Sequence, residues 1–279
     1  MKKKLGIADI IYYSVLSIMA LVILLPFIWL VSTSFDYFKS YTLPYPPRML
    51  PKKLSTFNYE MALTNVPIVR YLFNTVIIAV LDVIFNVFIA TLTGFCISKG
   101  KFPGKNLIMI FILSNMMVPF ETKLMPMYQI IKRLGLSNQF MGVILPGVMK
   151  NAMFMFFVKK FCDDLPDDLY EAGVIDGASK FRIYAQLFLP LMQPIIATIV
   201  ILDVVNVWND LLWPMIVLNK SQNYTIQIGL VLYNASANGQ VHAGIALALS
   251  ILSVIPLAIV FIFVQKYIVQ SIAFSGLKQ

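Results

Sequence analysis

Six apolar stretches constrain the fold of this chain more than any other feature of its sequence. An α-helix needs about 20 apolar residues to cross the hydrocarbon core of a bilayer, and each stretch reaches that length. In lipid the backbone must satisfy its hydrogen bonds within the segment, which favours helices. The stretches lie near residues 10–33, 72–98, 106–128, 140–161, 187–218 and 243–268. We therefore predict an all-α, polytopic membrane protein with six transmembrane helices in a single domain over residues 1–279.

The composition agrees with a chain embedded in lipid. Hydrophobic residues make up 59% of the sequence, charged residues make up 13%, and the mean hydropathy is +0.80. Soluble proteins carry about a quarter charged residues. The net charge of +9 is also typical of proteins that bind nucleic acid. The Lys and Arg residues, however, cluster at the ends of apolar stretches, where they reach lipid head groups. We expect contact with membrane lipid and no nucleic acid.

Two of the stretches differ from a simple span. The first follows three lysines, as a signal peptide would, but its apolar core is too long and no small-residue cleavage site follows it. We expect it to be retained as an anchor. The fifth, near 187–218, is longer than a bilayer requires and contains Pro190, Pro194 and Pro214. Proline interrupts helical hydrogen bonding, so part of this stretch should be kinked or interfacial.

The positive charges indicate the orientation, because short cytoplasmic loops are enriched in Lys and Arg. With the N-terminus inside, 12 of the 22 Lys and Arg residues lie inside, 9 lie outside and Lys150 falls within an apolar stretch. We therefore predict that the N- and C-termini are cytoplasmic. The same arrangement places the polar segment 162–186 in the cytoplasm.

The sequence lacks the motifs of common enzymes. It contains no GxxxxGK[ST] loop to hold phosphate, no nucleophile elbow and no HExxH helix. The single histidine, His242, and the two cysteines, Cys96 and Cys162, have no spacing typical of metal ligands. We therefore expect no enzyme activity, no catalytic residues, no metal site and no cofactor in this chain.

The polar segment contains a short motif of small and acidic residues. It consists of Glu171, Ala172, Gly173, Asp176, Gly177 and Ala178, followed by Leu187 and by Leu189-Pro190. This spacing resembles the cytoplasmic EAA loop of binding-protein-dependent ABC importer permeases, in which small residues let a short helix seat in a cleft of the ATPase subunit. The preceding residues, from Phe161 to Tyr170, resemble the carbohydrate branch of that family and its smaller, maltose-type subunit.

The resemblance implies a type I ABC importer permease in a bacterial cytoplasmic membrane that takes up oligosaccharides by alternating access. The implied partners are a second homologous permease chain, two ATP-binding cassette ATPase subunits that hold ATP and Mg, and an extracellular sugar-binding protein. The family's coupling loop corresponds to residues 162–186 and its tail to residues 269–279. The residues expected to contact the ATPase are the six of the motif and, in the tail, Ser275, Gly276, Leu277, Lys278 and Gln279.

Polar residues within the apolar stretches indicate a substrate pathway. Trp208, Asn209 and Asp210 combine an aromatic ring with an amide and a carboxylate, which suits a polyol in a membrane cavity. The alternative is a belt of aromatic residues at the membrane interface. Glu121 follows Pro119 and would face the path or cap a helix.

Charged residues within the membrane are costly and mark candidate sites. For Asp82, Lys150 and Asp203, contacts between helices are an equal alternative to a place in the pathway. A proton- or sodium-coupled secondary transporter would use Asp82, Asp203 and Asp210 as relay groups, but it would not need the cytoplasmic motif.

The predicted orientation is tested by cysteine labelling in a cysteine-free background. A cysteine at Ser221 should react with a membrane-impermeant maleimide added to whole cells, because the positive charges place this residue outside. A cysteine at Ser179 should react only after the cells are opened. The reverse pattern would overturn the topology.

Overall fold

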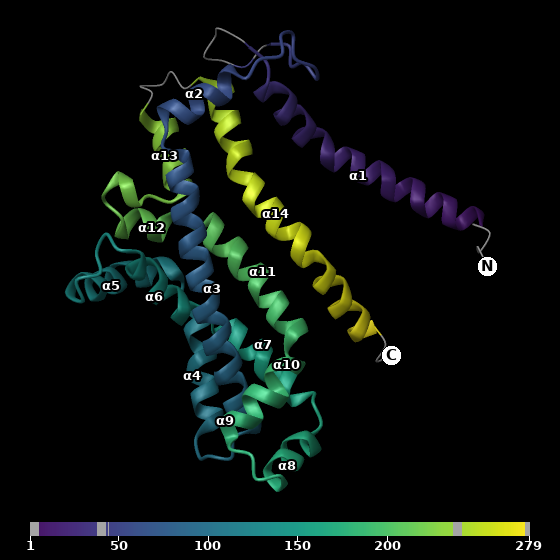
Figure 1. The fold of residues 1–279 in the computed structure, drawn as a ribbon, viewed down its shortest axis with the longest axis vertical. Helices are drawn as coiled ribbons and strands as arrows, with labels where there is room; N and C mark the ends of the chain where they lie inside the picture. Colours follow the sequence, from purple (N-terminus) through teal and green to yellow (C-terminus); the bar gives the residue numbers. More distant parts are fainter. Residues whose placement is uncertain (1–5, 38–42, 44, 237–241, 277–279) are drawn as a thin grey trace. The chain divides into compact units, whose positions relative to one another are not determined.

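The structure is a computed structural model that describes residues 6–37, 43, 45–236 and 242–276. Over these residues the chain forms helices and no strand, apart from an isolated bridge between Asp36 and Leu54. This confirms the all-α fold class. The elements are α1 (Ile7–Ser34), α2 (Phe57–Asn65), α3 (Ile68–Lys99), α4 (Lys105–Met117), α5 (Phe120–Arg133), α6 (Phe140–Lys150), α7 (Ala152–Asp163), α8 (Asp167–Ile175), α9 (Lys180–Ile183), the π-helix η1 (Tyr184–Phe188), α10 (Leu189–Leu191), α11 (Gln193–Asn209), α12 (Leu212–Val217), the 3-10 helix η2 (Ser221–Asn223), α13 (Ile226–Ser236) and α14 (Ala243–Gly276) (Figure 1).

Three helices are each long and apolar enough to cross a membrane within the described chain: Asp9–Ser34, Ile68–Lys99 and Ala243–Phe263. Three further spans arise if each bent pair of helices is one crossing. These pairs are Lys105–Met117 with Phe120–Arg133, Phe140–Gly147 with Ala152–Asp163, and Lys180–Leu191 with Gln193–Asn209, bent by 106°, 46° and 76°. The described chain thus holds up to six spans, the number expected from its apolar stretches.

The bent pairs differ from the continuous helices expected near 106–128 and 140–161. In the first pair, Pro119 has no N–H to continue α4, and α5 starts in a new direction directly after it. In the second, the backbone of Asn151 leaves the helical region at φ −90° and ψ 46°. Apolar length predicts that a segment crosses the membrane, whereas these single backbone positions determine where it bends.

The stretch predicted near 187–218 is also interrupted. It begins within the π-helix η1, bends after α10, and continues as α11 only to Asn209. The backbone of Asp210 is extended, with φ −70° and ψ 115°, so α12 is a separate short helix. The kinked or interfacial character expected from its prolines agrees with these breaks.

The contacts of the chain group into two compact units, and each is described by itself. The first comprises residues 1–69 and 229–255. In it, Asn58 on α2 donates its side-chain amide to the backbone oxygens of Ser34, at 2.8 Å, and Asp36, at 3.0 Å. Gly244 lies so close to Asn58 that an added Cβ would be 2.6 Å from its Oδ1 atom. These contacts hold the end of α1, α2 and the start of α14 together.

The second unit comprises residues 70–228 and 256–279 and contains the main hydrophobic core. Buried side chains from α3, α7, η1 and α11 form this core, among them Phe95, Phe154 and Phe188. Gly94 allows α3 to approach α7 closely, since an added Cβ would be 2.6 Å from Val158 Cβ. A small residue at a helix crossing is typical of membrane proteins, where close packing stabilises helix association.

Replacing Gly94 tests this crossing. Gly94→Ala should destabilise the protein by about 1–3 kcal/mol, because the methyl group would force α3 and α7 apart. The measurement is the thermal midpoint of the detergent-extracted protein. Gly6→Ala is the control, because the nearest atom to its new methyl group is Asp9 Oδ2 at 3.7 Å. Equal midpoints for wild type and Gly94→Ala would contradict the predicted contact.

Candidate functional site

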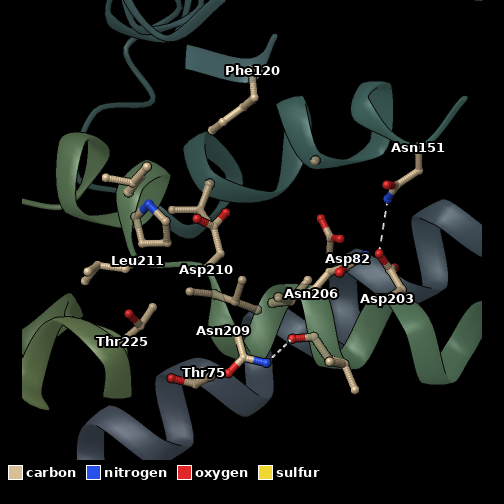
Figure 2. Close-up of a pocket in the computed structure, with 17 residues that line it drawn as sticks. Thr75, Asp82, Phe120, Asn151, Asp203, Asn206, Asn209, Asp210, Leu211 and Thr225 are labelled. Atoms are coloured by element: carbon tan, nitrogen blue, oxygen red, sulfur yellow. Dashed lines mark hydrogen bonds between the residues drawn. The ribbon is translucent and has the colours of Figure 1, made fainter. Parts of the chain in front are cut away.

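A cavity of about 450 Å³ opens among α3, α6, α11 and α12 in the second unit (Figure 2). Its lining is mixed. Aliphatic side chains such as Ile78 and Val207 lie beside the hydroxyl groups of Thr75 and Thr225. The polar lining residues on α11 and just beyond it are Asp203, Asn206, Asn209 and Asp210, and α3 contributes Asp82. The cavity therefore presents hydrogen-bonding groups within the candidate membrane spans.

Two of these carboxylates take part in a buried hydrogen-bond network. Asp82 is 3% exposed and Asp203 is 1% exposed. The side-chain amide of Asn86 donates to Oδ2 of both, at 2.8 and 2.9 Å. The side-chain amide of Asn151 donates to Asp203 Oδ1 at 3.1 Å (Figure 2). The network joins α3, α11 and the break before α7, which fits the alternative of contacts between helices for Asp82 and Asp203.

Sequence reasoning missed Asn86 and Asn151, which bridge this network. The available signal was an amide inside an apolar stretch, because a buried amide requires partners. Gly147 was missed as well. An added Cβ there would be 2.5 Å from Asp82 Oδ1, so a larger residue would displace this carboxylate.

The structure separates the four predicted pathway residues. Asn209 and Asp210 line the cavity. Asp210 is half-buried, and its Oδ1 accepts a hydrogen bond from the backbone N–H of Trp213 at 3.3 Å. Trp208 is 4% exposed and is not among the described residues that line the cavity. Glu121 lies exposed in the first turn of α5, and its neighbour Phe120 reaches the lining instead.

The motif of small and acidic residues forms the short helix α8 and the turn that ends it. Glu171 and Ala172 on the helix are exposed, as is Asp176, which follows it, and Ala178 is half-buried. The apolar side chains of Val174 and Ile175 are also exposed, at 52% and 85%. Exposed apolar side chains next to acidic residues on a short helix are typical of a protein contact surface.

The two glycines of the motif have structural roles within the segment. Gly177 has φ +72° and ends α8, with its N–H bonded to Val174 O at 3.0 Å and the N–H of Ala178 bonded to Gly173 O at 3.0 Å. This pattern is a Schellman motif, which favours glycine at the left-handed position. Gly173 is buried, and an added Cβ would be 2.9 Å from Ile183 Cγ1. The small residues therefore shape α8 itself.

Two of the five predicted tail residues lie within the described chain. Ser275 and Gly276 are the last residues of α14. Leu277, Lys278 and Gln279 lie outside the described residues. Contact between the tail and an ATPase stays a prediction.

Residues 86–274 match the family described as binding-protein-dependent transport system inner membrane component. This match covers more than half of the chain. It includes helix α8 and also the cavity-lining residues of α11. The chain belongs to this family. It is therefore an inner-membrane permease subunit of an ABC importer, which works with a substrate-binding protein and with ATPase subunits.

Individual relatives agree with this assignment. The chain is 32% identical over 206 residues to the arabinooligosaccharides transport system permease protein AraQ of Halalkalibacterium halodurans, covering 74% of this chain and 72% of the relative. It is 29% identical to the trehalose/maltose transport system permease protein MalG of Thermococcus litoralis over 94% of each chain. Its fold matches the crystal structure of a bacterial ABC transporter involved in the import of the acidic polysaccharide alginate. In that comparison the TM-score is 0.81 and the identity is 24%, over 94% of this chain and 96% of the other.

Substitutions of Gly177 distinguish a role in ending α8 from a role in docking. If only the left-handed backbone matters, Gly177→Asn should retain more transport than Gly177→Ala, because Asn tolerates positive φ better. If the residue also lies close against the ATPase, the larger Asn should be the more damaging. We expect Gly177→Asn to transport less sugar than Gly177→Ala, measured as uptake per extracted complex. Better transport by Gly177→Asn would limit this glycine to ending the helix.

Proposed function

We propose that this chain forms one half of the pore of an ATP-driven oligosaccharide importer. The main support for this proposal is the cavity, which presents amide, hydroxyl and carboxyl groups among apolar side chains within the candidate spans. The permeases AraQ and MalG, named for arabinooligosaccharides and for trehalose/maltose, support a sugar as the substrate. A volume of about 450 Å³ lies in the range typical of small-ligand sites.

Asn209 and Asp210 are the proposed sugar contacts in this half of the pore. Asn209 is exposed to the cavity, and its side-chain amide donates to Val205 O at 2.8 Å, which leaves its carbonyl oxygen to accept from a sugar hydroxyl. Asp210 would accept from a second hydroxyl. Apolar lining residues such as Ile78 and Pro214 would pack against the C–H faces of the ring.

Transport in this proposal is driven through α8. Its exposed face, with Glu171 and Ile175, would seat in a cleft of an ATPase subunit. ATP binding would close two such subunits, and their movement would turn the cavity from inward-facing to outward-facing. The second half of the pore would be a homologous permease chain, and an extracellular sugar-binding protein would deliver the substrate.

The ATP and Mg of the complex would be held by the ATPase subunits. The sequence of this chain has no GxxxxGK[ST] motif, which supports a permease without its own ATPase site. The proposed orientation has both termini in the cytoplasm, the side on which α8 would meet the ATPase. It rests on the distribution of Lys and Arg residues.

Asp210→Asn tests the proposed sugar contact. The substitution keeps an oxygen that can accept from Trp213 N, so assembly should be unchanged. Uptake of the sugar should fall about tenfold, because a charged hydrogen-bond partner is lost. The assay measures oligosaccharide uptake and the yield of detergent-extracted complex in the same strains. Asp9→Asn is the control, since Asp9 lies exposed in the first turn of α1 and its Oδ2 also accepts from a backbone N–H, that of Gly6, at 3.0 Å. Unchanged uptake in Asp210→Asn would remove the proposed contact.

Trp208→Ala supplies the contrasting result in the same assay. Trp208 is buried and does not line the described cavity, so its truncation should lower the yield of complex by loss of packing. Uptake per extracted complex should stay near the wild-type value. A selective loss of uptake at normal yield would instead return Trp208 to the pathway.

A further inference from the structure

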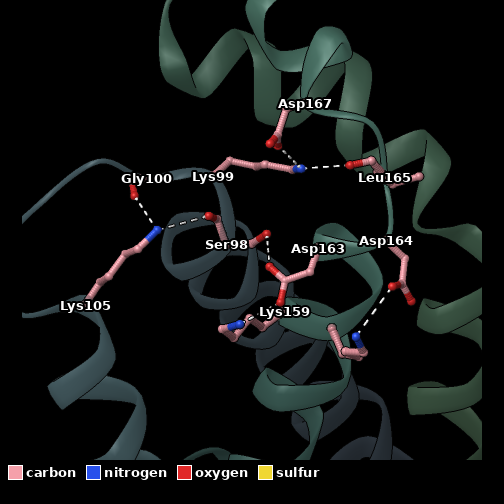
Figure 3. Close-up of polar contacts among 10 residues, drawn as sticks. Ser98, Lys99, Gly100, Lys105, Lys159, Asp163, Asp164, Leu165 and Asp167 are labelled. Carbon is pink, nitrogen blue, oxygen red and sulfur yellow. Dashed lines mark hydrogen bonds and ion pairs between the residues drawn. The ribbon is translucent and has the colours of Figure 1, made fainter.

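A buried cation lies at the C-terminal end of α3, away from both the cavity and the exposed face of α8. Lys99 is the last residue of α3, and its side chain is 5% exposed. Its Nζ donates to Asp167 Oδ1 at 2.6 Å and to the backbone oxygen of Leu165 at 2.9 Å (Figure 3). It also lies 5.9 Å from the centroid of the Phe188 ring. The ammonium group is thus held by three different parts of the chain.

The hydrogen-bond partners of Lys99 lie where α8 begins. Leu165 is in the turn between α7 and α8, and Asp167 is the first residue of α8. Asp167 is 80% exposed, yet the hydrogen bond and charge of Lys99 hold the pKa of its carboxyl group below the usual value. A buried ammonium group is costly unless it is paired and hydrogen-bonded. Lys99 therefore fixes the start of α8 to the end of α3.

Other contacts at this end hold α7 and η1 to α3. Ser98 Oγ donates to Asp163 Oδ1 at 2.6 Å, and the Phe95 ring lies 4.9 Å from that of Phe188 and 6.2 Å from that of Tyr170 on α8. Lys99 differs from these residues because it alone among them makes a directed bond to both the turn before α8 and its first residue.

The N-terminal half of α3 lines part of the cavity. Thr75, Ile78 and Asp82 line the cavity, and α3 runs without a break from Ile68 to Lys99. Asp82 and Lys99 are separated by roughly 26 Å along the axis, at about 1.5 Å for each residue of an α-helix. A displacement of the start of α8 would therefore act on a continuous helix that carries part of the cavity wall.

We propose that Lys99 is a positioning residue that passes the movement of α8 to the cavity through α3. The inference rests on the proposed function, since it requires that an ATPase moves α8. Without the Lys99 contacts, α8 still binds the ATPase, but its movement reaches α3 incompletely. ATP is then hydrolysed without a matching transport of sugar.

Lys105 provides a matched control at the same end of α3. Its Nζ donates to Gly100 O at 3.1 Å and to Ser98 O at 3.4 Å, so it also closes the end of the helix (Figure 3). Neither of these bonds reaches the turn before α8. A role limited to closing the helix end predicts the same result for Lys99 and Lys105, whereas the proposed role predicts different results.

The experiment uses the whole complex, with its ATPase subunits and binding protein, in proteoliposomes. It measures sugar transported per ATP hydrolysed, with maltose and an arabino-oligosaccharide as probes. Lys99→Met and Asp167→Ala should each lower this ratio about threefold, a change in the range expected for residues that couple two sites. Asp167→Glu should restore most of the ratio, and Lys105→Met should leave it unchanged.

Two results would overturn the inference. One is an unchanged ratio of sugar transported to ATP hydrolysed in Asp167→Ala. Because the Asp167 side chain is exposed, this variant should assemble even if Lys99→Met does not. The other is a lower yield of Lys99→Met complex with an unchanged ratio per complex, which would mean a role in folding alone. Failure of the proposed function looks different, because the wild-type complex itself would then show no ATP hydrolysis linked to either sugar.

Discussion

Lipid offers no hydrogen-bond partners, so a transmembrane backbone can leave the helical conformation only where protein or a water-filled cavity surrounds it. This constraint explains where the cavity lies. Phe120 starts α5 after the break at Pro119, Asn151 separates α6 from α7, and Asp210 follows the end of α11. All three line the cavity. These breaks in the helices thus lie around one polar cavity. There the backbone N–H and C=O groups that the helices leave unpaired can form hydrogen bonds.

The unbroken helix α3 complements these bent segments. Its packing against α7 depends on Gly94, and its N-terminal half and its C-terminal end contact different parts of the second unit. Towards one end, Thr75 and Asp82 face the cavity, and at the other, Lys99 holds the start of α8. Helix α3 therefore connects α8, which would meet an ATPase, to the cavity wall, which would meet a sugar. The polar contacts of α3 with α8 and around the cavity determine how firmly the two are linked.

The sequence predicted the fold class, the apolar spans and the exposed motif on α8, because these depend on composition, length and local spacing. It could not predict the bends at Asn151 and Asp210, which depend on single backbone conformations. Asn86 was missed because its role depends on Asp203, which lies 117 residues further along the chain. Only the folded structure brings Asp203 close to Asn86 and Asp82. Trp208 was grouped with Asn209 and Asp210 by sequence, yet neighbours on a helix diverge by about 100°, and only the latter two line the cavity.

Alternating access, as proposed for this permease, requires that the cavity opens to the other side of the membrane when the ATPase subunits bind ATP. A cysteine at Asn209, in a cysteine-free complex reconstituted into vesicles, measures this directly through its rate of reaction with an impermeant maleimide on each side. Without nucleotide, the cysteine should react from the side that bears α8. With a non-hydrolysable ATP analogue and the binding protein present, it should react from the opposite side. The same accessibility in both states would contradict alternating access at this cavity.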